Sequence, residues 1–67
     1  MKIDRRKLEV AMAQAGYNFI ALSDAAGVSR TTLSYINCGK SCRADVGGKI
    51  ARALSVDVEA ILSTEEQ

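Results

Sequence analysis

The segment from Asn18 to Lys40 constrains the fold more than any other part of this chain. Apolar residues recur in it at helical spacing on both sides of a short turn at Ala26-Gly27-Val28. Glycine can adopt the left-handed backbone conformation that ends a helix, and Ser29 after the turn is a good N-cap for the next helix. The pattern therefore predicts two short helices joined by a tight turn.

The second of these helices, which begins after Ser29, has an apolar side and a polar side. Leu33 and Ile36 are three residues apart and are expected to face the core. The side chains expected on the opposite, outward side are Arg30, Thr31, Ser34 and Tyr35. Because these types of side chain suit the major groove of DNA, the segment is interpreted as a helix-turn-helix with an outward recognition helix.

The same periodicity predicts the other helices. A first helix over residues 4–15, with Asp4 at its start and Gly16 at its end, is defined by Leu8, Ala11, Met12 and Ala15. The helix before the turn is capped by Asn18, and its buried face comprises Leu22, Ala25 and Ala26. A fourth helix is defined by Val46, Ile50, Ala51 and Leu54, and a short fifth one, capped by Asp57, by Val58, Ile61 and Leu62.

These elements predict an all-α protein, a compact five-helix bundle. We expect a single domain over residues 1–67, with its core in residues 4–62 and a frayed end over 63–67. Gly47 and Gly48 lie inside the predicted fourth helix, where a glycine costs about 1 kcal/mol relative to alanine. Their presence predicts a close helix crossing that requires a missing side chain.

The net charge of +1 conceals a basic body and an acidic end. All nine Lys and Arg residues lie within residues 1–53, where they outnumber the four Asp and Glu residues by five. Residues 54–67 contain the other four acidic residues and no basic one. A basic body fits a polyanionic partner, although a surplus of this size is weak evidence by itself. No apolar run approaches the length of a membrane span, so we expect a cytoplasmic protein without membrane contact.

Cys38 and Cys42 flank a short polar loop after the recognition helix. In a cytoplasmic protein both are expected to be ordinary reduced thiols. The alternatives are a redox switch or a metal site shared by two chains, since the chain has no histidine to complete one. No nucleophile has a plausible base and no Gly-rich phosphate loop occurs, so we expect no catalytic residue, enzymatic activity, cofactor, metal or small-molecule ligand.

Three motifs in the chain resemble the Xre/Cro family, the lambda-repressor-like helix-turn-helix domains of phage and bacterial regulators. These motifs are the Gly27-Val28-Ser29 turn, the Gly39-Lys40 pair, and the run Lys49-Ile50-Ala51-Arg52-Ala53-Leu54. They occur in the family's order and at similar spacing, and the resemblance extends over residues 5–62. It implies a five-helix bundle that binds double-stranded DNA as a homodimer, with the third helix in the major groove.

The resemblance also implies which side chains contact DNA. The base-reading positions hold Arg30, Thr31, Ser34 and Tyr35, and the phosphate positions hold Asn18, Ser29, Lys40 and Arg43. Arg30 can reach a guanine edge with two hydrogen bonds or meet only phosphate. Phe19 occupies a site that is usually a polar DNA contact, where it could touch a thymine methyl, stack on a sugar or serve a protein partner.

The chain departs from the family at a second place. Met12 and Asn37 stand where the family often pairs an arginine of the first helix with a glutamate of the third. Both charged partners are absent together, so no unpaired buried charge remains. We therefore expect a packed substitute at this place and an unchanged fold.

Val58, Ile61 and Leu62 provide more apolar surface than a short helix needs for its own docking, so we expect dimerisation through this C-terminal edge. The function that the sequence favours is a sequence-specific transcriptional regulator, a repressor of phage, mobile-element or bacterial genes that binds an inverted-repeat operator. The alternative is a protein-interaction module on the same fold, either antitoxin-like or a heterodimer partner. Phe19 and the small net charge favour that alternative.

Overall fold

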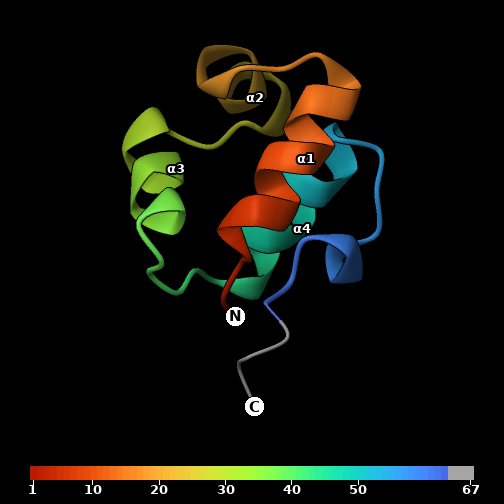
Figure 1. Ribbon diagram of the computed structural model, residues 1–67. Helices are drawn as coiled ribbons and strands as arrows, with labels where there is room; N and C mark the ends of the chain where they lie inside the picture. The colour runs from red at the N-terminus through yellow and green to blue at the C-terminus, as the bar shows by residue number, and fades with distance from the viewer. Residues whose placement is uncertain (64–67) are drawn as a thin grey trace.

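The computed structural model describes residues 1–63, which form four α-helices and one short 3-10 helix (Figure 1). The elements in chain order are α1 (Arg5–Ala15), α2 (Phe19–Ala26), α3 (Arg30–Asn37), α4 (Ala44–Ala53) and η1 (Val58–Ala60). The all-α prediction and the first four predicted helices are confirmed. The predicted fifth α-helix is wrong, because only the 3-10 turn η1 forms there.

The start of each of the first three helices is fixed by the residue that the sequence predicted. Asp4 Oδ1 accepts a hydrogen bond from Lys7 N at 3.0 Å, Asn18 Oδ1 accepts one from Ala21 N at 2.8 Å, and Ser29 Oγ accepts one from Thr32 N at 3.1 Å. Each bond satisfies a backbone donor that the first turn of a helix leaves unpaired. Local side-chain chemistry therefore sets these three boundaries.

The helices surround one core, to which every element except η1 contributes a buried side chain. In Figure 1, α3 stands at the left, α2 crosses the top, and α1 runs down the centre in front of α4. The fully buried large side chains are Leu8, Leu22, Leu33, Ile36, Ile50 and Ile61. Met12 is 7% exposed and belongs to this core, whereas Asn37 is half-buried, and a packed substitute formed by the two together stays a prediction. Ala15 and Ala25, which were predicted to face inward, are exposed instead.

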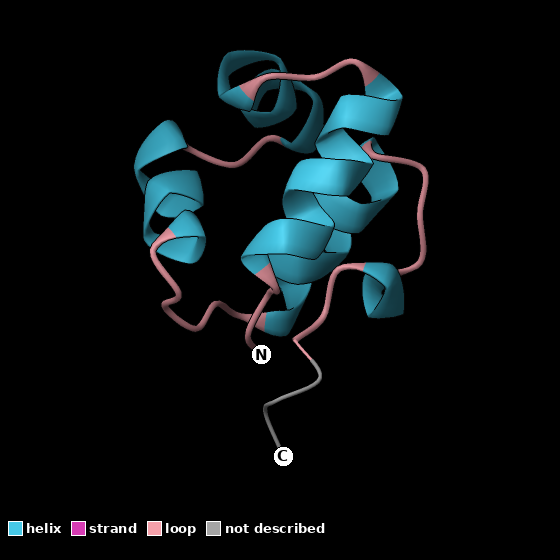
Figure 2. Cartoon of the chain, viewed as in Figure 1, coloured by secondary structure: helices cyan, strands magenta, loops and turns pink. Residues whose placement is uncertain are grey.

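The chain after η1 pairs with the N-terminal residues rather than continuing as a helix. Ile3 and Leu62 form an antiparallel bridge, in which Asp4 N donates to Ile61 O at 2.8 Å and Ser63 N donates to Lys2 O at 2.9 Å. Figure 2 shows these two segments as loops that meet below α1. This pairing uses the backbone groups that a fifth α-helix would need. The frayed end predicted over 63–67 does not include Ser63, and the rest of it lies outside the described residues.

The burial of Ile61 corrects the predicted dimer surface. Its side chain is 0% exposed within a single chain, so it supplies contacts to the chain's own core and none to a partner. Val58 and Leu62 are half-buried, and Val58 packs against the same core. Of the three predicted residues, only these two keep some surface that a second chain could cover.

The structure accounts for Gly47, one of the two glycines inside α4. A Cβ atom on Gly47 would overlap the sulfur of Met1, whereas a Cβ on Gly48 would meet nothing within 4 Å. The predicted helix crossing is therefore wrong at Gly47, where the space is filled by the Met1 side chain from the N-terminal segment and not by another helix. Nothing in the structure explains Gly48.

Candidate nucleic-acid interface

The turn between α2 and α3 sets the angle at which the candidate recognition helix is presented. Gly27 ends α2 with a φ of 68°, a conformation that favours glycine. Val28 follows and is 7% exposed, so its side chain anchors the turn in the core. Ser23 Oγ donates to Val28 O at 2.6 Å, which braces the turn from the last part of α2. The sequence interpretation missed this role of Ser23. The only signal for it was the position of this serine, five residues before Val28.

Helix α3 is held by its inner side and exposes its outer side. Leu33 and Ile36 are 0% and 1% exposed, respectively, whereas the four residues predicted to face outward, Arg30, Thr31, Ser34 and Tyr35, are all exposed. Tyr35 is 59% exposed, so most of its ring is open to solvent. The outward orientation of these four residues is confirmed, and their contact with DNA stays a prediction.

The two cap residues lie at exposed helix starts that favour an anion. Asn18 and Ser29 are exposed, and each uses a side-chain oxygen to hold an amide of the first turn. The positive end of the helix dipole and the remaining first-turn amides attract negative charge to such sites. Capping is therefore compatible with the phosphate contacts predicted for both residues, and the structure leaves both accessible.

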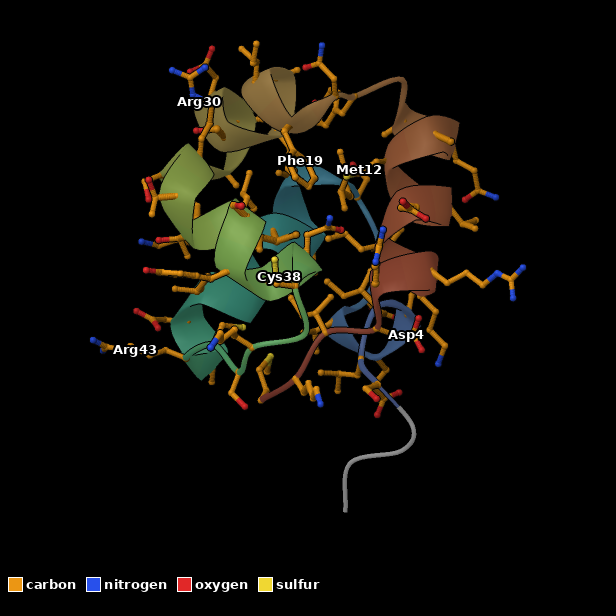
Figure 3. All side chains as sticks on the ribbon, turned by 60° about the vertical axis from the view of Figure 1, so that its left-hand side comes forward. Asp4, Met12, Phe19, Arg30, Cys38 and Arg43 are labelled. Atoms are coloured by element: carbon orange, nitrogen blue, oxygen red, sulfur yellow. The ribbon has the colours of Figure 1, made fainter. Side chains whose placement is uncertain are left out.

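Lys40 and Arg43 add cations beyond the end of α3. Both are exposed, and Arg43 Nε lies 3.3 Å from Asp45 Oδ1, in a pair whose side chains are 85% and 55% exposed. An ion pair that is so open to water contributes at most about 1 kcal/mol, so a phosphate can replace the aspartate at little cost. In Figure 3, Arg30 and Arg43 project from the same side of the molecule, on which α3 lies. The structure thus brings cations to both ends of the recognition helix.

Phe19 is half-buried and packs against the core. Figure 3 shows its ring directed from α2 into the molecule, toward the side on which Met12 lies. This packing accounts for the apolar character of the buried part of the ring. Part of the ring stays exposed, so a contact of Phe19 with DNA or with a protein partner stays a prediction.

The two cysteines differ in environment. Cys38 is exposed, whereas Cys42 is half-buried and packs against the core. Cys42 therefore contributes packing to the core that Cys38 does not. Under reducing conditions, Cys42→Ser should lower the free energy of unfolding by about 1 kcal/mol, because the smaller side chain loses packing against the core. Cys38→Ser should change it by less than about 0.5 kcal/mol in the same urea titration. Equal effects of the two substitutions would contradict the packing seen at Cys42.

Comparison with known proteins agrees with this geometry. A family model described as the Cro/C1-type HTH DNA-binding domain matches residues 7–67. The match includes the whole helix-turn-helix and the loop that carries Lys40 and Arg43, and it confirms the resemblance to the Xre/Cro family. The comparisons with curated proteins and with solved structures gave no match. None of the helices in residues 1–63 is both long and apolar enough to cross a membrane.

Proposed function

The chain belongs to the Cro/C1-type helix-turn-helix DNA-binding domain family, and from this membership we propose that it is a sequence-specific transcriptional regulator. The observation that carries the proposal is the orientation of α3. Its inner side is locked by Leu33 and Ile36, which are almost completely buried, while its outer side presents polar and aromatic groups to solvent. A helix fixed in this way can enter the major groove without a change of fold.

The exposed residues divide into two classes of DNA contact. Arg30, Thr31, Ser34 and Tyr35 lie on α3, and we assign them to base edges in the major groove. Asn18, Ser29, Lys40 and Arg43 lie at helix starts or beside the recognition helix, and we assign them to the phosphate backbone. Phosphate contacts place the helix in register, and base contacts then select the sequence.

We further propose that the regulator binds its operator as a homodimer. An open apolar groove of about 280 Å³ lies between α1 and η1, and it is lined by Arg6, Lys7, Val10, Ala11, Gln14, Val56 and Ala60. Val10 is 52% exposed there. Together with the half-buried Val58 and Leu62, this groove gives the C-terminal edge apolar surface that a second chain could cover. A bound dimer would exclude other proteins from the operator, so we propose repression as its mode of action.

Selection of bound duplexes from a random pool tests both proposals at once. Sequencing of the selected duplexes should yield an inverted repeat, with half-site centres about 34 Å apart, one turn of DNA. Binding should also weaken steeply as salt rises, since phosphate contacts release counterions. A single unrepeated half-site would contradict the dimer, and failure to enrich any sequence would contradict the proposed function.

A further inference from the structure

The first four residues, Met1–Asp4, form a strap that ties together two distant parts of the chain, and we call them the N-terminal strap. At one end, Met1 N donates to Cys42 O at 2.8 Å, and Cys42 N donates to Met1 O at 2.7 Å. At the other end, Ile3 is 3% exposed and pairs with Leu62 in the antiparallel bridge. The strap is therefore anchored in the core by Ile3, and Met1 reaches from this anchor to the loop before α4.

The Met1 side chain packs against α4 at Gly47, where the missing side chain leaves room for it. Gly47 is buried, and a Cβ atom there would overlap the Met1 sulfur. A glycine inside a helix costs about 1 kcal/mol relative to alanine, so a glycine retained at a buried contact indicates a specific need for space. Here the space is occupied by the Met1 side chain.

The residue that Met1 holds lies between the two cations assigned to phosphate. Lys40 N donates to Tyr35 O at 3.1 Å, which ties Lys40 to α3, and Arg43 O accepts from Gly47 N at 3.1 Å, which ties Arg43 to α4. Cys42 stands between them and exchanges its backbone hydrogen bonds with Met1. The strap thus fixes the middle of the loop on which both cations are mounted.

We propose that Met1 and Gly47 are positioning residues for DNA binding, which act through the loop that carries Lys40 and Arg43. This inference rests on the proposed function. A loop that is fixed before binding loses less conformational freedom when its cations meet phosphate, so binding is tighter. Neither Met1 nor Gly47 needs to touch DNA for this effect.

Gly47→Ala tests the proposal, with Gly48→Ala as the matched control in the same helix. The new methyl group at residue 47 displaces the flexible end of Met1, while both substitutions favour the helical conformation. Neither variant should therefore have a lower thermal midpoint than the wild-type chain. Gly47→Ala should bind the selected operator about threefold to tenfold more weakly, with an unchanged slope of log affinity against log salt, because Lys40 and Arg43 still neutralise the same phosphates. Gly48→Ala should bind as the wild type does. Equal operator affinity of the two variants would overturn the proposal.

Amide hydrogen exchange provides a second readout that needs no DNA. In the wild-type chain, the Cys42 amide should exchange slowly, because it donates to Met1 O. In Gly47→Ala, this amide should exchange at least tenfold faster than in Gly48→Ala. Should the wild-type chain fail to bind any duplex, the proposed function fails, and exchange at Cys42 alone decides on the strap. Fast exchange at Cys42 in the wild type, or equal exchange in the two variants, would overturn it.

Discussion

Replacement of Ile61 with alanine should lower the free energy of unfolding by about 2–5 kcal/mol. The side chain is 0% exposed, and it lies where the chain turns from η1 into its pairing with Asp4. The substitution removes buried apolar surface and leaves a cavity that a small core fills only in part. For a chain of 67 residues the thermal midpoint should drop by at least about 10 °C, as measured by circular dichroism.

Leu62→Ala is the control for this prediction. Leu62 is the next residue and only half-buried, so its truncation should cost less than half as much as that of Ile61. Measurement across a range of protein concentrations separates the core role of Ile61 from a role in the dimer. If the difference in thermal midpoint between Ile61→Ala and the wild type vanished on dilution, Ile61 would contact a partner chain instead of its own core.

The sequence was sufficient for the parts of the fold that local chemistry determines. Asp4, Asn18 and Ser29 each cap a helix through a side chain three residues from its partner amide, so the cap and the helix start are visible in a short stretch of sequence. Gly27 likewise marks the turn by a conformation that other residues avoid. The outward side of α3 followed from the spacing of Leu33 and Ile36, because the residues that face the core also determine which residues lie on the opposite side of the helix.

The sequence was insufficient where contacts join residues that are far apart along the chain. Ile61 has an apolar neighbour at helical spacing, which predicted a helix, but its backbone pairs with Asp4, 57 residues earlier, and the helix stops. The need for space at Gly47 was visible, yet the occupant, Met1, was not, because periodicity describes helices and not single extended side chains. The partial burial of Phe19 was not visible for a related reason, since a position at a helix start gives no information about the depth of its ring.

Within the candidate site, the sequence could predict which side chains are exposed and what chemistry they carry. It could not predict the hydrogen bonds and ion pairs that hold them. The residues that face solvent on α3 were identified in advance, and the structure adds the bond from Ser23 to Val28 that braces the preceding turn. It also adds the ion pair of Arg43 with Asp45, which shows that this cation has a competing partner in the free protein. Such supports depend on which side chains meet in space, and no motif in the chain encodes them.

Replacement of Arg30 with alanine should weaken binding to the selected operator by about 1–3 kcal/mol, or about 5- to 150-fold. Arg30 is exposed in the first turn of α3, from which an arginine can make two hydrogen bonds to a guanine in the major groove. Loss of those bonds should affect the specific duplex far more than a random duplex, and it should relax the preference at one base pair of each half-site. Competition gel shifts with operator and random duplexes measure both effects.

Lys40→Ala and Arg52→Ala show whether the loss is one of base reading or of charge. Lys40 is assigned to phosphate, so its removal should weaken specific and random duplexes alike and lower the salt slope by about one. Arg52 is an exposed arginine of α4 outside the predicted contact set, and its removal should leave the preference for the operator unchanged. All three variants lose one positive charge, and therefore only a change in the ratio of specific to random affinity distinguishes a base contact from a phosphate contact. If Arg30→Ala left that ratio unchanged, Arg30 would be a phosphate contact, and the reading of sequence by α3 would have to rest on Thr31, Ser34 and Tyr35.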